Sequence, residues 1–183
     1  WKYFIYNSVN IFSELPDYNP YIFSGLPFAA NIQAGMFYPV DIFFYFIESL
    51  IAFKITFFFN YFIFLFGCYK LISKFSNNIQ TVFFGVICIG FGWFAVYYAP
   101  LKQVYNAYIW IPLLFYYLFE FLENKGGLNI VKYSVCLAFS ILGGHPQFPF
   151  YAILFSTLAS GAYLVFCPNF ITKKKILGLI AGA

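Results

Sequence analysis

The sequence has little charge, and that scarcity excludes most soluble folds. Only 9% of its 183 residues are charged, whereas 63% are hydrophobic and 29 are phenylalanine. A soluble domain of this length cannot bury so much apolar surface in one core. Several runs approach the roughly 20 apolar residues that a bilayer-spanning helix needs, so we predict an all-α, polytopic transmembrane helical bundle. The runs do not alternate between apolar and polar residues, which argues against a β-barrel.

Arginine is absent, and histidine and cysteine are scarce. All ten basic residues are lysine, and several lie in short loops, where they report membrane topology rather than nucleic-acid binding. The four cysteines show no CxxC or Cys/His ligand spacing, so the sequence gives little support to a zinc or redox site. We therefore interpret the cysteines as buried structural thiols.

Apolar runs and polar breaks predict the domain organisation. Residues 1–40 are rich in proline, asparagine and glycine, and we expect them to form an outer loop that leads into an interfacial helix. Residues 41–183 are expected to hold about six spans, some short and tilted. These lie at roughly 50–69, 79–98, 108–121, 130–142, 148–166 and from 176 onward. The chain is expected to be one transmembrane domain, the N-terminal part of a longer protein, with a further span before Trp1.

The lysines assign a side of the membrane to each loop. Seven of the ten lie in or beside three alternating loops, near residues 70–74, 125–132 and 173–175. The positive-inside rule places these loops in the cytoplasm. The opposite, outer face then holds residues 1–40, the loop over 99–107 and the hairpin at His145. Three polar loops are therefore expected to converge on one face.

Each outer loop carries polar residues that suit a site but also have a plain structural interpretation. Glu14 and Asp17 are either a general base or cation ligands, or solvated loop acids. Lys102 either pairs with a phosphate or is an ordinary surface lysine, and Asn106 either donates to a sugar hydroxyl or caps a helix. His145, in a Gly-Gly-His-Pro-Gln turn, either exchanges a proton or binds a phosphate, or belongs to a structural turn and hydrogen-bonds a neighbouring loop.

Two groups of motifs resemble the YfhO-like family of bacterial membrane proteins. The first is Asn-Pro-Tyr-Ile-Phe-Ser-Gly-Leu-Pro-Phe at 19–28, followed by Gln33 and Phe-Tyr-Pro at 37–39. The second is Trp-Ile-Pro-Leu-Leu at 110–114 and Gly-His-Pro-Gln at 144–147. The resemblance covers nearly all of the chain in the right order. It implies a GT-C-type glycosyltransferase of the bacterial cytoplasmic (inner) membrane, which transfers a sugar from a polyprenyl-phosphate carrier to a cell-envelope glycopolymer, glycolipid or protein on the outer face.

The resemblance also implies roles for individual residues. An acid in the first outer loop serves that class as base or metal ligand, which makes Glu14 and Asp17 the catalytic candidates and a divalent cation a candidate cofactor. The family places this acid just after a first span, which here is expected before Trp1. The candidate substrate-binding residues come from the matched motifs and the outer loops: Asn19, Gln33, Tyr38, Lys102, Asn106, His145 and Gln147.

Two other functional classes are compatible with the sequence. One is a non-catalytic membrane transport or flippase-type subunit, and the other is a structural assembly subunit. A transporter favours ionisable residues or broken helices near mid-membrane, whereas this chain places its polar groups in outer loops. The expected partners are the lipid bilayer, the lipid-linked sugar donor and the envelope acceptor, and no nucleic acid.

Overall fold

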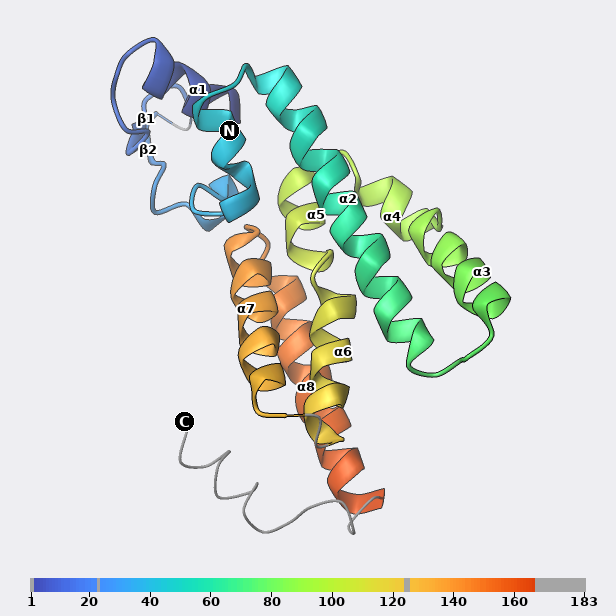
Figure 1. Cartoon of the computed structure of the whole chain (residues 1–183). Helices are drawn as coiled ribbons and strands as arrows, with labels where there is room; N and C mark the ends of the chain where they lie inside the picture. The colour runs from blue at the N-terminus through green and yellow to red at the C-terminus, as the bar shows by residue number, and fades with distance from the viewer. Residues whose placement is uncertain (1, 23, 124–125, 167–183) are drawn as a thin grey trace.

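The computed structural model describes residues 2–22, 24–123 and 126–166, which form an elongated helical bundle with a small cap at one end (Figure 1). The cap comprises α1 (Lys2–Asn10), the strands β1 (Tyr18–Asn19) and β2 (Leu26–Pro27), and the 3-10 helices η1 (Ile32–Ala34) and η2 (Pro39–Tyr45). The two strands pair antiparallel, with Tyr18 opposite Pro27. The bundle comprises α2 (Ser49–Ser73), α3 (Ile79–Gly90), α4 (Trp93–Tyr98), α5 (Lys102–Tyr108), α6 (Ile111–Leu122), α7 (Leu128–Leu142) and α8 (Gln147–Phe166).

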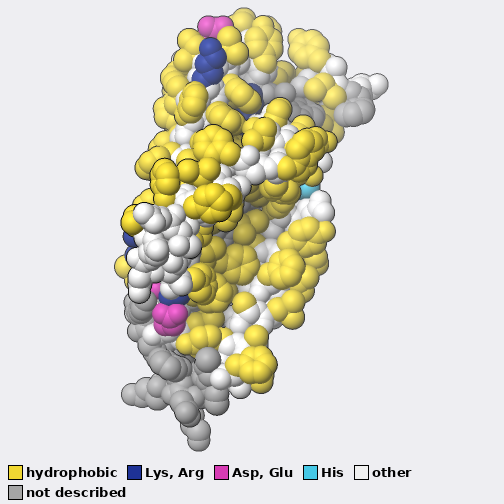
Figure 2. All heavy atoms as spheres, turned by 90° about the vertical axis from the view of Figure 1, so that its right-hand side faces the viewer, with side chains coloured by type: hydrophobic (Ala, Val, Ile, Leu, Met, Phe, Trp, Pro, Cys, Tyr) yellow, Lys and Arg dark blue, Asp and Glu magenta, His cyan; other side chains and the backbone are white. Residues whose placement is uncertain are grey.

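Within the described residues, three helical stretches are long and apolar enough to cross a membrane: α2, the α3–α4 stretch Ile79–Tyr98, and α8. The 25 residues of α2 extend for about 37 Å, more than the roughly 30 Å of a bilayer core. Phe58, Phe62 and Phe84 are exposed on the outside of the bundle. Figure 2 shows hydrophobic side chains over most of one face. Such a surface suits lipid rather than water.

The expectation of about six spans is met in part. Helix α7 coincides with the predicted span at 130–142 but is shorter than the three long stretches, with 15 residues. The predicted span at 108–121 is α6, which follows α5 after a short interruption at Ile109 and Trp110. Pro112 in the first turn of α6 explains the interruption, because proline cannot continue a preceding helix. The predicted span from 176 onward lies outside the described residues.

A glycine separates α3 from α4. Gly92 has extended backbone dihedrals, and a Cβ atom there would lie 2.7 Å from the carbonyl oxygen of Cys88. The Tyr61 hydroxyl of α2 donates a hydrogen bond to the carbonyl oxygen of Gly90, at 3.1 Å. A carbonyl left free by the break is thereby satisfied within an apolar stretch.

The cap has its own small core, which corrects the prediction of a loop over residues 1–40. Ile5, Phe28, Ala34 and Phe44 are buried against one another and against Ala52 in the first turn of α2. Apolar residues spread through this proline-rich segment therefore fold it into α1, a strand pair and two 3-10 helices. The expected interfacial helix over 41–49 is instead η2, which ends at Tyr45.

The predicted loop over 99–107 is also wrong, because most of it forms α5. From Val104 onward the residues of this helix are buried, and Tyr105 and Tyr108 belong to the main core. That core lies among α2 and α4 to α8, and Val40 of η2 also belongs to it. Because α5 packs inside the bundle close to the cap, it brings Lys102 and Asn106 next to the cap's polar residues.

Candidate functional site

A charge cluster connects the cap to the bundle. Asp41 of η2 is fully buried, with its Oδ2 2.7 Å from Nζ of Lys2 and its Oδ1 2.8 Å from Nζ of Lys102. The two lysine side chains are only 15% and 11% exposed. A buried carboxylate is costly unless it is paired and hydrogen-bonded. The cluster therefore requires α1, η2 and α5 to be assembled.

Local sequence explains how Asp41 is placed. Pro39 begins η2, where its fixed φ angle suits the first helical turn, and Asp41 follows within that turn. Phe44, also on η2, lies beneath both lysines, with its ring centroid 5.8 Å from Nζ of Lys2 and 4.9 Å from Nζ of Lys102. The ring face attracts each ammonium and keeps its surroundings apolar.

Lys2 and Lys102 differ in how many of their ammonium N–H groups already have an acceptor. Lys2 donates to the carbonyl oxygens of Ala34, at 2.7 Å, and Gly35, at 3.0 Å, in addition to its ion pair. Its three N–H groups are thus all occupied. Lys102 contacts Asp41 and the hydroxyl of Thr56, at 2.8 Å, which leaves it one N–H without an acceptor among the described residues. Lys102 is therefore the lysine that can accept an anionic ligand.

A chain of hydrogen bonds runs from the bundle core to the same carboxylate. The Trp110 indole donates to the Tyr38 hydroxyl at 3.0 Å, and that hydroxyl donates to the Asn60 carbonyl at 3.0 Å. The Asn60 amide donates to Asn106 at 2.8 Å, and the Asn106 amide donates to Oδ2 of Asp41 at 3.2 Å. Every donor points toward the carboxylate, so each bond strengthens the next.

A pocket of about 250 Å³ opens beside the cluster. It is lined by Lys2, Gln33, Ala34, Gly35, Phe53, Pro100, Lys102, Gln103, Asn106 and Gly143. These residues come from the cap, from α2, from α5 and the residues just before it, and from the hairpin between α7 and α8. The three segments that were expected to converge each contribute to this pocket, although two of them fold into helices and strands instead of loops. Their position on the outer face of a membrane stays a prediction.

Two glycines let the α7–α8 hairpin close against the pocket. A Cβ atom on Gly143 would lie 2.6 Å from the backbone nitrogen of Ala107, so only glycine permits this approach to α5. Gly144 has a φ of +100° and would direct a Cβ atom to 2.9 Å from the carbonyl oxygen of Ile32. Both positions exclude larger side chains, which fixes the hairpin tip on α5 and on the cap.

Burial and charge act in opposite directions on Lys102. Desolvation lowers the pKa of its ammonium, while the adjacent Asp41 carboxylate raises that pKa and the nearby Lys2 lowers it. Burial is the larger effect, so the pKa of Lys102 lies below that of an ordinary lysine. An incoming anion would favour the charged form and offset part of the desolvation cost.

Four predicted residues lie at or beside this site. Lys102 and Asn106 belong to the charge cluster, Gln33 lines the pocket, and Tyr38 belongs to the hydrogen-bond chain. The interpretation of Lys102 as a surface lysine is wrong, since its side chain is nearly buried. The alternative role of Asn106 as a helix cap is also wrong, because its side chain bonds Asp41 and Asn60 instead.

The two predicted catalytic acids lie elsewhere. Glu14 and Asp17 are exposed and line a separate groove of about 710 Å³ with Phe4 and Ser8 of α1. At 100° per residue, Phe4 and Ser8 point away from the side of α1 that carries Lys2. The groove and the lysine pocket are therefore on opposite sides of this helix.

The three remaining predicted residues make local contacts. Asn19 is buried, and its side-chain oxygen accepts a hydrogen bond from the backbone N–H of Tyr21 at 2.9 Å. The half-buried His145 packs on Phe148, with ring centroids 5.4 Å apart. Gln147 is exposed and donates to a neighbouring tyrosine hydroxyl on α8 at 2.9 Å. None of the three lines the lysine pocket.

Sequence reasoning missed the acid at the centre of the site. Asp41 stands in Tyr-Pro-Val-Asp-Ile-Phe-Phe, where apolar neighbours on both sides indicate burial. A buried acid needs a cationic partner, so an acid between apolar residues could have been identified from the sequence as part of a charge cluster. Lys2, Thr56 and Asn60 carried no such signal, since nothing local distinguishes them from loop or span residues.

The chemistry of the site is that of a cation-rich pocket beside a buried ion cluster, with amide donors on its walls. Lys102 supplies a positive charge, and Gln33, Gln103 and Asn106 supply amide groups that can hydrogen-bond polar ligands. Within the described residues, no group of three or more histidine, cysteine or acidic side chains is placed to hold a metal ion. No protein-family model, curated protein or solved structure matches this chain.

Proposed function

We propose that this chain belongs to a multi-pass glycosyltransferase of the bacterial cytoplasmic membrane, which moves a sugar from a polyprenyl-phosphate carrier to a cell-envelope acceptor. The observation that carries the proposal is the pair of nearly buried lysines that share one buried carboxylate beside a pocket. The motif resemblance to YfhO-like proteins points in the same direction.

The charge balance favours a phosphate ligand. Lys2, Lys102 and Asp41 together carry a formal charge of +1, in surroundings that burial makes weakly solvating. A sugar linked to a lipid through one phosphodiester carries a charge of −1, which would neutralise the cluster. Charge-assisted hydrogen bonds from ammonium to phosphate are among the stronger ones in proteins.

The depth of the pocket suits a lipid-linked donor. Thr56, which bonds Lys102, is seven residues beyond the first residue of α2, or about 10 Å along its axis. If α2 spans the bilayer, Lys102 lies just inside one membrane surface. A lipid phosphate lies at that level while its hydrocarbon chain stays among the tails.

The residues of the pocket divide the work of transfer. The oxygen of the acceptor hydroxyl attacks the anomeric carbon as the bond to the lipid phosphate breaks, and the hydroxyl proton passes to the departing phosphate monoester. The remaining N–H of Lys102 stabilises that phosphate as it leaves. Asp41 holds both lysines with its two oxygens, so we assign it a positioning role rather than that of base. The amides of Gln33 and Gln103 are placed to bind sugar hydroxyls.

Binding of polyprenyl phosphate, the product common to all such donors, tests the proposal. We expect Lys102→Gln to weaken binding by about tenfold or more, the value of one charge-assisted hydrogen bond. Sugar transfer from a panel of polyprenyl-phosphate hexoses should fall with it in membrane vesicles. Lys54→Gln is the matched control, because Lys54 is an exposed lysine of α2. Equal binding by the Lys102 variant and the parent protein would refute the proposal.

A further inference from the structure

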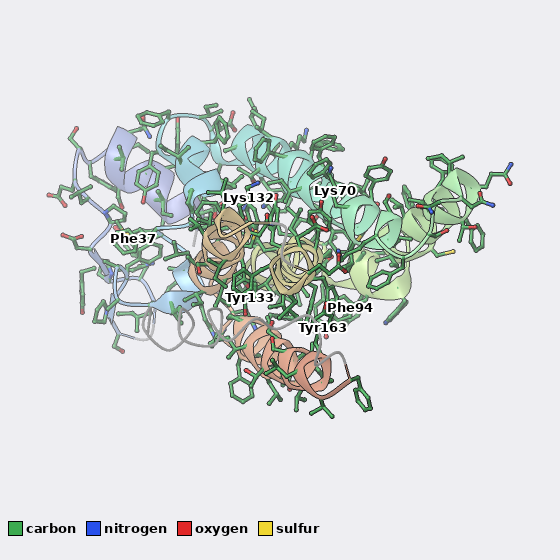
Figure 3. The ribbon with its side chains drawn as sticks, turned by 60° about the horizontal axis from the view of Figure 1, so that its bottom comes forward. Phe37, Lys70, Phe94, Lys132, Tyr133 and Tyr163 are labelled. Carbon is green, nitrogen blue, oxygen red and sulfur yellow. The ribbon has the colours of Figure 1, made fainter. Side chains whose placement is uncertain are left out.

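The cap carries a second cavity, the groove of about 710 Å³ on the side of α1 that faces away from Lys2. Its described lining residues all fall between residues 4 and 21, in α1, in the segment after it and around β1. Figure 3 shows the cap at one side of the bundle and α3 at the other. The groove is thus a feature of the cap and not of the long apolar helices.

The groove is acidic. Glu14 and Asp17 line it, and within the described residues neither carboxylate has an ion pair or a hydrogen bond. No lysine is among the described residues of its wall. The two acids therefore give the groove a formal charge of −2, whereas the lysine pocket has an excess of positive charge. Water solvates exposed carboxylates well, so this charge sets the sign of a ligand without requiring one.

Ser8 supplies the observation that requires a ligand group. This residue lines the groove but is only 4% exposed, and its hydroxyl makes no hydrogen bond within the described part of the chain. By contrast, Ser134 on α7 donates to the carbonyl oxygen of Ile130, at 3.0 Å. A nearly buried hydroxyl without a partner costs stability. A ligand that offers an N–H group to the Ser8 oxygen would remove that cost.

Aromatic rings form much of the remaining wall. Phe4, Phe12, Tyr18 and Tyr21 line the groove, and Tyr18 and Tyr21 are exposed. The ring of Tyr21 packs edge-on against Phe4, with centroids 6.4 Å apart. Aromatic faces attract ammonium groups and pack on hydrocarbon, whereas a hard metal cation prefers oxygen ligands all round. Rings beside unpaired carboxylates therefore favour an organic cation.

Backbone hydrogen bonds hold the groove in shape. The carbonyl oxygen of Asp17 accepts from the N–H groups of Phe28, at 2.7 Å, and Ala29, at 3.2 Å. The N–H of Glu14 donates to the carbonyl oxygen of Ser8, at 2.9 Å. The two acids and the serine are thus fixed relative to the cap, which lowers the cost of ordering them around a ligand.

We propose that this groove binds a linear polyamine, an alkyl chain that carries two or more ammonium groups. The ammonium groups pair with Glu14 and Asp17, and one of them donates to the Ser8 hydroxyl. The methylene groups between them lie along the rings of Tyr18 and Tyr21. The single ammonium of a phosphatidylethanolamine headgroup would leave one acid unpaired and would bring a phosphate into an acidic groove. The site does not depend on the proposed sugar transfer.

Isothermal titration calorimetry with spermidine, on the full chain in phosphatidylcholine nanodiscs at low salt, tests the proposal. We expect saturable binding. Glu14→Gln and Asp17→Asn should each weaken it about fivefold, the upper value for an exposed ion pair, and Tyr21→Leu about threefold. Glu48→Gln is the matched control, because Glu48 is also an exposed acid but lies outside the groove. It should change the affinity by less than about twofold.

Ser8→Ala separates a binding role from a structural one. We expect it to weaken spermidine binding about threefold, as for one hydrogen bond, without lowering the melting temperature of the unbound protein in circular dichroism. A lowered melting temperature with unchanged binding would overturn the role of Ser8 as a ligand contact.

Four results would overturn the polyamine site itself. These are no saturable binding of spermidine, equal weakening by Glu14→Gln and Glu48→Gln, equal affinity for the neutral sugar maltose, and loss of spermidine binding in nanodiscs that contain phosphatidylethanolamine. The last two would assign the groove to a sugar or to a lipid headgroup.

Discussion

The two ends of the bundle carry opposite versions of the same charge motif. At the cap, two lysines share one carboxylate, and Asp41 is fully buried. At the other end, Lys74 is shared by two carboxylates, and Glu123 is 37% exposed. The first cluster has an excess of positive charge among its three members, whereas in the second a single lysine lies between two acids. The excess at the cap is the kind that an anionic ligand group would neutralise.

The clusters also differ in how they are assembled. Glu120 lies in the last turn of α6 and Glu123 is its C-cap, so one helix end supplies both acids, and Lys74, the C-cap of α2, supplies the lysine. The cap cluster draws Lys2, Asp41 and Lys102 from three separate elements. A cluster of that kind exists only after the cap has docked, which makes it the more sensitive of the two to substitution.

The largest expected effect is on stability at the cap. Asp41→Asn keeps the shape of the side chain but leaves two nearly buried ammonium groups without a counter-charge. We expect a loss of about 3–5 kcal/mol in the free energy of unfolding, as for other broken buried ion pairs. Reversible unfolding in mixed micelles, followed by circular dichroism, measures it. Asp17→Asn, at an exposed acid, should change stability by less than about 0.5 kcal/mol. Comparable losses of stability in Asp41→Asn and Asp17→Asn would show that the buried acid contributes no more to stability than an exposed one.

A smaller effect is expected at the opposite end. Lys74→Met removes the cation between Glu120 and Glu123 but leaves Glu123 able to reach water. The expected loss is about 1–2 kcal/mol, between the values typical of exposed and buried pairs. The same unfolding experiment applies, with Lys132→Met as control. A loss equal to that of Asp41→Asn would show that the two clusters do not differ as proposed.

The smallest effect concerns the pH dependence of ligand binding. Because burial lowers the pKa of Lys102, its ammonium deprotonates at a lower pH than an ordinary lysine, whose pKa is about 10.4. Binding of polyprenyl phosphate should therefore weaken as the pH rises, beginning below that value. Lys102→Arg should retain its binding over the same range, because a guanidinium does not deprotonate there. If the parent protein and Lys102→Arg showed the same pH profile, the charge of Lys102 would not control the binding of polyprenyl phosphate.

The helices were largely predictable from the sequence, and their departures have local causes. Helix α8 begins at Gln147, one residue before the predicted span, because a continuous apolar run leaves few alternatives. Helix α2 extends past the predicted end at residue 69 to Ser73, into residues interpreted as a loop. The extension is stabilised by the pairing of Lys74 with α6, which local sequence does not reveal. The break at Gly92 depends on backbone contacts that a hydropathy pattern does not record.

The candidate site was predictable in part. Lys102 and Asn106 were identified because they are polar residues in a short segment between apolar runs. Asp41 was missed because its neighbours resemble the start of an interfacial helix. Lys2 was missed because it is one lysine among ten. Neither residue is chemically unusual, and only the contact between them makes either one notable.

The sequence by itself determined the class of this protein: helical, mostly apolar, with stretches long enough for a membrane and few polar groups to place. Composition suffices for that conclusion, because the amount of apolar surface that must be kept from water depends on the whole chain and not on its tertiary contacts. The tertiary structure alone decided which lysine meets which acid and which glycine lets two backbones approach. Ion pairs and close packing depend on distances of a few ångströms between residues remote in sequence, and those distances exist only once the cap, α5 and the α7–α8 hairpin have come together.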